Sequence, residues 1–371
     1  MIVSILKESK INELRTPLVP KDILLLKKSF PKLHFLIEPS KQRIINDHEY
    51  YKVGCEKFTN QKVDLYLSIK EVSLNKIKSN QNYMMFSHTI KGQVNNMPLL
   101  KKILKGNCSL IDYELLKNKE GKRQLGFGWY AGVMGAYLTL SRFLQLKERQ
   151  KKNYITDDLI KNFQNVDLKD LKILITGDGL VSEGAQFFLK KIGILSKKNP
   201  NRNNQHFKVL SPSQYYKRVD GRFNLNDLMK GKGKYESQFT EHIEGYDIYL
   251  ACHYWDNRFP KLFSKKDVNK GFFKIIGDIT CDINGSVPTT VKSTSLASPY
   301  FRYKNMEIMA VDNLPSGLPL EASKHFSRKL KVVLPKILKS LNEDTIEEYY
   351  VSKKGYLNFR YLNLLNFLVK S

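Results

Sequence analysis

The sequence predicts an α/β protein made of two Rossmann-like domains, each built on a parallel sheet, with a cleft between the domains. Three observations support this prediction. Apolar runs of strand length recur along the chain, and longer polar or amphipathic stretches separate most of them. This alternation begins twice, near Ile2 and again near Leu171. The length of 371 residues is also more than a single hydrophobic core usually serves.

The first alternation predicts a domain over residues 1–125. Its strand candidates are Ile2–Leu6, Leu33–Ile37, Leu65–Ile69, Tyr83–Phe86 and Cys108–Ile111. Strands of a parallel sheet are buried on both faces, so continuous apolar runs of this length fit them. The tail over residues 319–371 reads as helix and is expected to fold back onto this domain, which makes the domain discontinuous.

Residues 126–318 predict the second domain. It opens with a glycine- and aromatic-rich segment, Gly126–Leu146, which predicts a long helix whose small residues let backbones pack closely. After a polar stretch come the strand candidates Leu171–Ile175, Phe207–Leu210, Asp247–Ala251, Phe273–Ile276 and Glu307–Val311. Residues 197–205, with one proline and several asparagines, predict an inserted loop.

The composition limits the classes of function. A net charge of +26 would suit a nucleic-acid-binding protein, because basic residues release counterions from phosphates. The basic residues are mostly lysine, however, and are spread over every segment instead of forming one stripe. We therefore expect no nucleic-acid partner, and a lysine-rich surface whose field attracts small carboxylates and phosphorylated cofactors.

The cysteines and the first residues predict the compartment. Four cysteines lie far apart, without a CxxC pair or histidine spacing that would hold a metal, so we expect reduced thiols and no metal site. Met1–Glu8 runs directly into strand-like sequence and has no signal-peptide pattern, and no membrane span is indicated. We expect a cytoplasmic monomer or small homo-oligomer without a membrane partner.

A glycine-rich turn follows the strand candidate that ends at Ile175. Strand, Gly-x-Gly turn and amphipathic helix occur in the order that a dinucleotide-binding fold requires. Gly177 allows the tight turn, Gly179 lets the backbone approach a pyrophosphate, and the helix N-terminus offers amides to that anion. Ser182 replaces the usual third glycine, so an ordinary strand-to-helix turn stays the alternative. The expected cofactor contacts here are Gly177, Gly179, Leu180, Val181 and Ser182.

The end of the next strand candidate, Phe207–Leu210, predicts the choice of cofactor. An Asp or Glu at this position would bind the ribose 2′-hydroxyl of NAD, whereas basic residues accommodate the 2′-phosphate of NADP. The chain instead continues through Ser211 to Lys217 and Arg218 without a carboxylate. We expect these three residues near the ribose, NADP(H) as the favoured cofactor and NAD(H) as possible. The alternative is that both cations are solvated loop charges.

Two ionisable residues, Lys70 and His88, come directly after strand candidates of the first domain. Ligands of open α/β sheets bind beyond the carboxyl ends of the strands, so both side chains are expected to face one crevice if these two strands are neighbours in the sheet. Glu71 and Glu114 would tune the pKa values of this pair for acid–base chemistry. Each residue alone has an ordinary alternative as a surface or loop residue, so the joint placement carries the prediction.

Two arginines are candidates for binding a substrate carboxylate. Arg15 follows the first strand candidate at loop distance, and its planar fork suits a carboxylate. Arg123 precedes the glycine- and aromatic-rich segment, at the mouth of the predicted cleft. The alternative for both is a solvated surface charge.

Five groups of motifs occur in order along nearly the whole chain: Lys7–Leu18, Phe86–Gln93 with Asn96–Leu100, Gly177–Gln186, Gly277–Ser286 and Val311–Ser323. The first resembles a motif shared by alanine dehydrogenase, transhydrogenase and saccharopine-forming enzymes. The other four resemble the lysine-ketoglutarate reductase branch. The chain is thus similar to the saccharopine dehydrogenase and lysine-ketoglutarate reductase family.

This resemblance implies a reaction and a set of site residues. In the family, two Rossmann-like domains enclose a cleft where lysine and 2-oxoglutarate are joined as saccharopine, or released from it, with NAD(P). The resemblance makes Lys70 and His88 the acid–base pair and Glu71 and Glu114 the carboxylates that tune them. The other implied contacts are Arg15, Lys91, Gln93, Arg123 and Phe127 for the substrate, and Asp278 and Asp312 for the cofactor.

Other functions stay open at this point. A related enzyme, either alanine dehydrogenase-like or an opine-forming reductase, would keep the fold and use another amine and keto acid. A non-catalytic ligand-sensing protein would also keep the fold, but it would not need Lys70 and His88 together. A nucleic-acid-binding protein is suggested by the charge alone.

Overall fold

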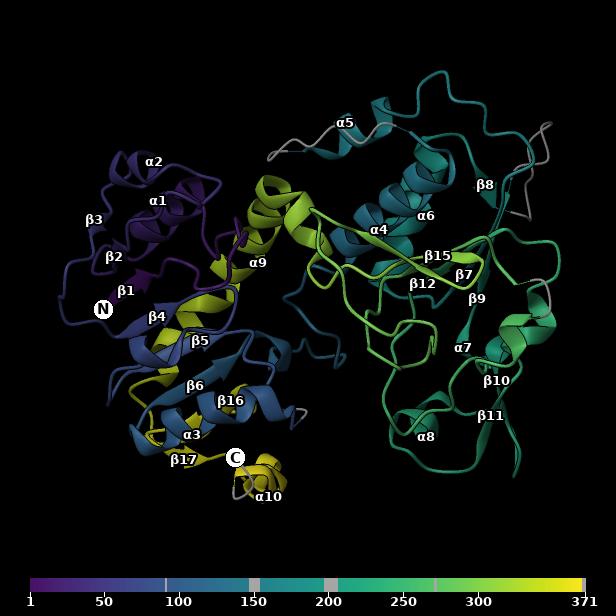
Figure 1. The fold of residues 1–371 in the computed structure, drawn as a ribbon. Helices are drawn as coiled ribbons and strands as arrows, with labels where there is room; N and C mark the ends of the chain where they lie inside the picture. The colour runs from purple at the N-terminus through teal and green to yellow at the C-terminus, as the bar shows by residue number, and fades with distance from the viewer. Residues whose placement is uncertain (91, 147–153, 197–205, 270–271, 369–371) are drawn as a thin grey trace. The chain divides into compact units, whose positions relative to one another are not determined.

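A computed structural model describes residues 1–90, 92–146, 154–196, 206–269 and 272–368 (Figure 1). The chain divides into two compact units, one formed by Met1–Gly126 with Pro319–Ser371 and the other by Phe127–Leu318. Each unit holds a mostly parallel sheet with helices packed on it, which confirms the predicted α/β fold class. No helix within the described ranges is long and apolar enough to cross a membrane.

The first unit is built on an eight-stranded sheet with the order β17-β16-β6-β5-β4-β1-β2-β3. Its strands are β1 (Ile2–Ile5), β2 (His34–Ile37), β3 (Glu56–Lys57), β4 (Leu65–Leu67), β5 (Asn82–Met85), β6 (Ser109–Asp112), β16 (Tyr350–Lys353) and β17 (Tyr356–Leu357). All five strand candidates of this unit form strands. The pairings among β1 to β6 are all parallel, as continuous apolar runs predict.

Helices cover both faces of this sheet. They are α1 (Pro20–Ser29), α2 (Asp47–Tyr51), α3 (Met97–Lys105), α9 (Pro319–Ser340) and α10 (Leu365–Leu368). The α1 crossover runs from β1 to β2 and the α3 crossover from β5 to β6, in opposite directions along the sheet, so right-handed connections place them on opposite faces. Buried Asp22 of α1 accepts hydrogen bonds from Ser327 and Lys331 of α9, both at 2.7 Å, which joins the two helices.

The C-terminal tail is helical to Ser340 in α9 and again from Phe359 to Leu368, so the prediction of an all-helical tail is wrong for the segment between these helices. This segment forms the hairpin β16–β17, and β16 pairs antiparallel with β6. Lys354 and Gly355 form its two-residue turn with φ values of 50° and 82°, the conformation that matches the twist of a hairpin. Tyr350 and Val351 are fully buried, and this burial favours the strand.

The second unit is built on a seven-stranded sheet with the order β14-β15-β13-β12-β7-β9-β8. Its strands are β7 (Lys172–Thr176), β8 (Leu195–Ser196), β9 (His206–Leu210), β12 (Ile248–Ala251), β13 (Ile275–Asp278), β14 (Tyr300–Tyr303) and β15 (Met306–Met309). All five strand candidates of this unit form strands. Because β14 is antiparallel to β15, this sheet too is mixed rather than purely parallel.

A separate hairpin joins β10 (Tyr216–Arg218) to β11 (Tyr235–Ser237). The loop expected at 197–205 lies outside the described residues.

Helices of the second unit are α4 (Gly128–Phe143), α5 (Thr156–Lys161), α6 (Leu180–Lys191), α7 (Pro212–Tyr215) and α8 (Leu225–Met229). The long helix expected from the glycine-rich segment is α4, which packs tightly on α6. A Cβ on Gly132 of α4 would lie 1.9 Å from the carbonyl oxygen of Val181, and one on Gly184 of α6 would lie 2.0 Å from that of Trp129. The small residues are therefore required, because the two backbones touch.

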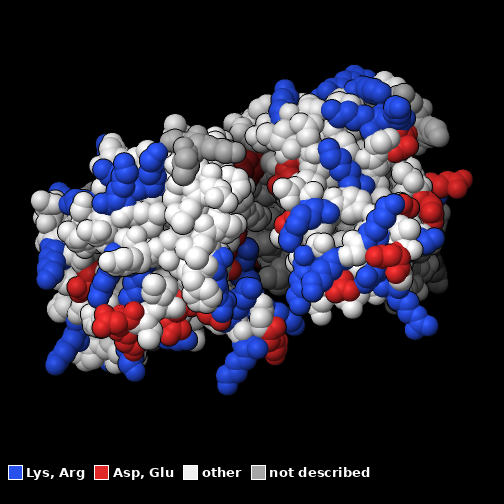
Figure 2. Space-filling model, turned by 90° about the horizontal axis from the view of Figure 1, so that it is seen from below, with Lys and Arg blue, Asp and Glu red and all other residues white. Residues whose placement is uncertain are grey.

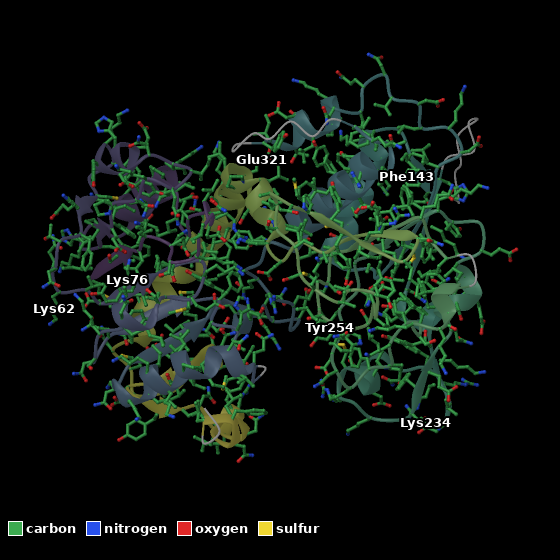
Figure 3. All side chains as sticks on the ribbon, in the orientation of Figure 1. Lys62, Lys76, Phe143, Lys234, Tyr254 and Glu321 are labelled. Carbon is green, nitrogen blue, oxygen red and sulfur yellow. The ribbon has the colours of Figure 1, made fainter. Side chains whose placement is uncertain are left out.

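The surface carries lysine and arginine side chains in many places. Figure 2 shows them spread over the visible face with aspartate and glutamate between them, rather than gathered in one stripe. Some of these lysines make ion pairs; Lys76, labelled in Figure 3, lies 2.7 Å from Glu38. The distribution agrees with a solvated lysine-rich surface.

Candidate active site

Three neighbouring parallel strands of the first unit end at one edge of the sheet, and each is followed by a predicted site residue. Lys70 follows β4, His88 follows β5 and Glu114 follows β6. The pairing of β4 with β5 and of β5 with β6 brings these strand ends side by side. The structure therefore brings the predicted acid–base residues to the edge where α/β sheets bind ligands.

His88 and Glu71 are in direct contact. The Nδ1 atom of His88 lies 2.5 Å from Oε1 of Glu71, and both side chains are about 30% exposed, at 30% and 29%. His88 has a φ of 49°, a left-handed conformation that directs its ring and is uncommon for a residue other than glycine. Burial opposes the charged form of Glu71, but the hydrogen bond and charge of His88 outweigh it, and the pKa of Glu71 is lowered.

Glu114 and Arg123 also meet at this edge. Nη2 of Arg123 lies 3.3 Å from a carboxylate oxygen of Glu114, and the arginine side chain is 46% exposed. Both residues were predicted for the site in different roles, Glu114 as a tuning carboxylate and Arg123 as a substrate contact. Their pairing leaves a half-exposed guanidinium at the edge of the sheet.

Arg15 is buried and already pairs with a carboxylate of its own chain. Its Nε and Nη2 donate to the two oxygens of Glu13 at 2.7 and 2.6 Å, and both side chains are almost fully buried. Binding of a substrate carboxylate by Arg15 would therefore have to share this guanidinium with Glu13. The sequence reasoning missed Glu13, although it lies in the same motif two residues earlier.

Two other predicted substrate contacts have different surroundings. Gln93 is exposed, and its side-chain oxygen accepts a hydrogen bond at 3.1 Å from Asn96, whose amide also donates to the carbonyl of His88 at 3.3 Å. Asn96 thus links Gln93 to His88. Phe127 is buried at the start of α4 in the second unit. Lys91 lies outside the described residues.

Two buried carboxylates lie behind the acid–base residues, and the sequence reasoning missed both. Glu8 accepts the backbone N–H of Ile69 at 2.6 Å and of Lys70 at 3.0 Å. Burial and the charge of Glu13 raise the pKa of Glu8 to about 8. The signal available in the sequence was a glutamate three residues beyond an apolar strand.

Asp112 occupies the equivalent position at the end of β6. It accepts the backbone N–H and the hydroxyl of Ser87 at 2.9 and 2.5 Å, and the backbone N–H of Glu114 at 2.8 Å. Burial raises its pKa to about 6. Asp112 therefore joins Ser87, the residue before His88, to Glu114.

The glycine-rich turn of the second unit connects β7 to α6. Gly177 has a φ of 96°, and a Cβ there would lie 2.6 Å from Cα of His253, so only glycine fits. A Cβ on Gly179 would meet no atom within 4 Å. Gly179 is the N-cap residue of α6, and no side chain caps the first amides of this helix. Uncapped amides facing open space fit the pyrophosphate of a dinucleotide. Leu180 is 51% exposed beside this space, Val181 is half-buried, and Ser182 is buried.

A buried network of neutral polar groups supports this turn. The hydroxyl of Thr176 lies 2.8 Å from that of Tyr249 and 2.7 Å from Nδ1 of His253, whose Nε2 lies 2.8 Å from the hydroxyl of Ser286. Burial lowers the pKa of His253 to about 3, so the imidazole is neutral. The sequence reasoning missed His253, although it follows the strand candidate ending at Ala251.

The two aspartates predicted to bind cofactor differ in exposure. Asp278 is fully buried, its carboxylate accepts hydrogen bonds from Thr280 and Thr290 at 2.5 and 2.6 Å, and burial raises its pKa to about 6. It holds the loop after β13 in place. Asp312, in contrast, is exposed.

The residues expected near the ribose lie after β9. Ser211 caps α7, with its backbone N–H donating to Gln214 at 2.9 Å. Lys217 and Arg218 belong to the β10–β11 hairpin, where Lys217 stands opposite Glu236. Arg218 contacts two aspartates, Asp220 at 2.8 Å and Asp227 at 2.7 Å. These carboxylates offset its charge, which weakens the case for Arg218 as a phosphate ligand.

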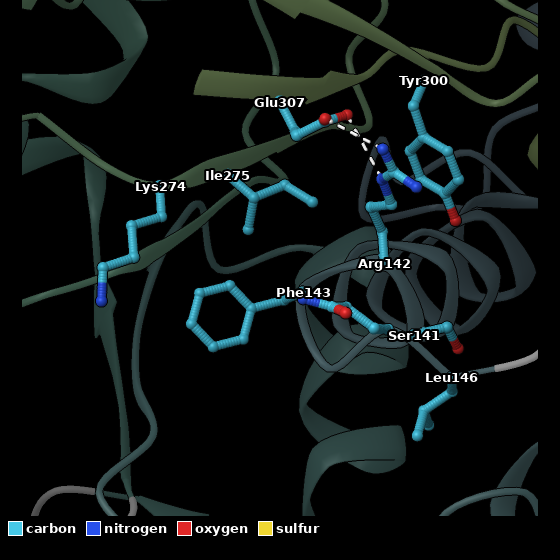
Figure 4. Close-up of a pocket in the computed structure, with 9 residues that line it drawn as sticks. Ser141, Arg142, Phe143, Leu146, Lys274, Ile275, Tyr300 and Glu307 are labelled. Atoms are coloured by element: carbon cyan, nitrogen blue, oxygen red, sulfur yellow. Dashed lines mark hydrogen bonds and ion pairs between the residues drawn. The ribbon is translucent and has the colours of Figure 1, made fainter. Parts of the chain in front are cut away.

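A hollow of about 750 Å³ lies elsewhere in the second unit (Figure 4). Its lining includes Arg142, which pairs with Glu307 at 3.0 Å, and Ile275, the first residue of β13. It therefore lies at the amino end of β13, away from the edge where α/β sheets bind ligands. Among the described residues, no group of three or more His, Cys, Asp and Glu side chains is arranged to hold a metal ion.

Comparison with protein families gives two matches. Residues 4–134 match the alanine dehydrogenase/PNT N-terminal domain, and residues 166–357 match the alanine dehydrogenase/PNT C-terminal domain. Among solved structures, an L-alanine dehydrogenase is similar with a TM-score of 0.68 and 14% sequence identity, over 99% of this chain and 100% of the other. At that identity the likeness concerns the fold alone.

Two curated proteins extend the comparison. The alpha-aminoadipic semialdehyde synthase of Arabidopsis thaliana is 32% identical over 88% of this chain, which spans 37% of that protein's length. The saccharopine dehydrogenase [NAD(+), L-lysine-forming] of Schizosaccharomyces pombe is 24% identical over 94% of this chain and 95% of its own. The predicted resemblance to saccharopine dehydrogenases is thereby confirmed.

Proposed function

This chain belongs to the alanine dehydrogenase/PNT family, and from that premise we propose that it is an NAD(P)-dependent oxidoreductase that interconverts L-lysine plus 2-oxoglutarate and saccharopine. The observation that carries the proposal is the grouping of Lys70, Glu71 and His88 at adjacent strand ends, with Glu71 bonded to His88 at 2.5 Å. The relative named as an L-lysine-forming saccharopine dehydrogenase supplies the substrate class.

The proposed reaction needs several proton transfers. Addition of the lysine amine to the keto carbon of 2-oxoglutarate gives a carbinolamine, and loss of water gives an imine. Reduction of this imine would use the hydride that a nicotinamide cofactor supplies when bound. Lys70 and His88 are the groups that take and return protons. Because Nδ1 of His88 contacts Glu71, exchange with the substrate is expected at Nε2.

The carboxylates of the substrates need cationic partners. Arg123 is the candidate with a half-exposed guanidinium, held by Glu114. Arg15 is a candidate that would have to share its fork with Glu13. Gln93 would contribute an amide close to His88 through Asn96. A planar guanidinium binds a carboxylate through two hydrogen bonds, so these positions suit a dicarboxylate substrate.

The cofactor would be held by the turn between β7 and α6. Gly177 and Gly179 would leave room for the pyrophosphate, while exposed Leu180 would cover it on one side. We propose NADPH as the favoured cofactor because no carboxylate stands in the chain from Ser211 to Arg218. The pairing of Arg218 with two aspartates reduces that preference, so NADH is the alternative. A cytoplasmic location and the oligomeric state stay predictions.

The test is a substrate panel. Purified protein is expected to oxidise NADPH, and NADH more slowly, when given lysine and 2-oxoglutarate together, and to do neither when one of them is omitted. The panel includes alanine formation from pyruvate and ammonia, and other amine and keto-acid pairs. If another pair is the efficient one, the saccharopine assignment is wrong and the wider family assignment stands. If no pair is turned over, the ligand-sensing alternative is favoured.

A further inference from the structure

We propose that Glu8 is a positioning residue for the acid–base chemistry, because its buried carboxylate fixes the backbone on which Lys70 stands. The inference deepens the proposed function and rests on it, since it takes Lys70 to act in the reaction. Glu8 is 7% exposed and accepts two consecutive backbone N–H groups, those of Ile69 and Lys70, at 2.6 and 3.0 Å. One oxygen of the carboxylate serves each amide.

The sheet explains why this contact is needed. Strand β4 ends at Leu67, so the amides beyond it lie at the edge where the strand ladder stops. Glu8 follows the adjacent strand β1 by three residues, which lets it reach across to them. The carbonyl of Lys70 is held as well, since it accepts the hydroxyl of Ser68 at 2.7 Å. With both its N–H and its carbonyl fixed, Lys70 has a defined direction for its side chain.

The same arrangement recurs one strand further along. Asp112 accepts the backbone N–H of Ser87, the residue before His88, at 2.9 Å, and the backbone N–H of Glu114 at 2.8 Å. Each proposed proton-transfer residue thus stands on backbone that a buried carboxylate holds. Holding reactive groups in place from behind preserves their mutual geometry, and a misplacement of about 1 Å costs about 100-fold in rate.

The choice of a carboxylate at position 8 also argues for positioning rather than stability. Burial and the nearby charge of Glu13 disfavour the ionised form, and Arg15 offsets only part of this. An amide of the same shape has no ionised form and would avoid this penalty. A neutral amide, however, has one acceptor oxygen and cannot accept both N–H groups in the same way. Geometry at Lys70 is what the glutamate provides.

The test compares Glu8→Gln with Glu38→Gln as a matched control. Glu38 also follows a strand, β2, and its carboxylate accepts hydrogen bonds from the backbone N–H of Lys7 at 2.8 Å and from Nζ of Lys76 at 2.7 Å, without touching Lys70. Four quantities are measured in each variant: kcat, the cofactor KM, the melting temperature, and hydrogen exchange of the peptide covering residues 66–71. The variants are made in the full chain.

In Glu8→Gln we expect faster exchange at Ile69 and Lys70, kcat lowered about 10- to 100-fold, an unchanged cofactor KM and an equal or higher melting temperature. Glu38→Gln should leave exchange and kcat unchanged. A fall in kcat that only follows a lower melting temperature would mean a structural role and would overturn the proposal, as would unchanged exchange or unchanged kcat. If the wild type turns over no substrate pair, the proposed function fails, and the exchange data still decide whether Glu8 holds this backbone.

Discussion

The carboxyl ends of the strands form one edge of each sheet, and these two edges have opposite character, although both sheets are mostly parallel. At the edge of the first unit, partly exposed ionisable side chains such as Glu71 and His88 stand in front of buried carboxylates. At the edge of the second, the polar groups around Thr176 and His253 are neutral and buried, and a glycine turn exposes backbone. One edge is suited to moving protons and the other to binding an anion through amides.

The contrast extends to pH dependence. The pKa of Glu8 is raised from 4.5 to about 8, so the folded state holds its proton more tightly, and the stability this gives is lost as pH rises through about 8. The pKa of His253 is lowered from 6.5 to about 3, so its contribution is complete above 6.5 and is lost as pH falls toward 3. Glu8 in the first unit and His253 in the second thus respond to pH in opposite directions.

The largest expected effect comes from replacing His88, which changes the edge of the first unit alone. His88→Gln removes a proton-transfer group, so kcat should fall about 10²- to 10⁴-fold while cofactor affinity and the melting temperature stay near those of the wild type. Steady-state kinetics with the best substrate pair, together with cofactor titration, measures this. The control is His34→Gln, an exposed histidine at the amino end of β2. A variant that kept wild-type kcat would remove His88 from the chemistry.

The next effect concerns the packing behind the second edge. Gly184→Ala places a methyl group 2.0 Å from a backbone oxygen of α4, which forces the two helices apart. We expect a loss of about 3 kcal/mol in the free energy of unfolding, measured by urea denaturation. Gly245→Ala, at a site where a Cβ meets no atom but φ is 79°, separates backbone strain from steric overlap. Equal losses in the two variants would contradict the packing argument.

A smaller effect than that of Gly184→Ala is expected from His253, which makes the stability of the protein sensitive to acid. Between pH 7 and pH 5, His253 should cost the folded state about 2 kcal/mol, because the unfolded chain takes up a proton there that the buried ring refuses. Urea denaturation at both pH values should show that His253→Gln lowers stability at pH 7 yet flattens the change with pH. The same pH dependence in wild type and variant would show that other groups dominate.

A smaller effect is expected at the glycine-rich turn of the second unit, where the cofactor is proposed to bind. In Gly179→Ala the added methyl group meets no atom of the chain within 4 Å, so the melting temperature should stay the same. The methyl group would occupy the space proposed for the pyrophosphate, and we expect cofactor affinity to fall about tenfold, or ~1.4 kcal/mol. Titration of cofactor fluorescence measures it. Unchanged affinity would place the pyrophosphate elsewhere.

The smallest effect is expected far from both edges. Arg142 and Glu307, beside the hollow in Figure 4, form a partly exposed ion pair with side chains 49% and 30% exposed. A double-mutant cycle with Arg142→Gln and Glu307→Gln should give a coupling of less than about 1 kcal/mol. Neither variant should change kcat. A clear change in kcat would connect this hollow to the reaction.

Local sequence patterns were sufficient to predict the fold class and to place the predicted strands to within two residues at each end. All ten strand candidates form strands, because continuous apolar runs must be buried on both sides of a sheet. The placement of Lys70 and His88 at strand ends followed from the same local pattern, whereas the sheet order made the two strands neighbours. The glycine turn was readable as well, because Gly177 adopts a φ of 96° that few other residues tolerate.

The partners of the residues at the strand ends depend on the tertiary structure. Glu8 reaches Ile69 and Lys70 across 61 and 62 positions, and His253 reaches Thr176 across 77, so no local pattern could predict either contact. The hairpin after Ser340 also depends on its docking to β6. Local propensity and periodicity fix strands and turns, whereas burial of a polar group and its hydrogen-bond partner are set by segments distant in the chain.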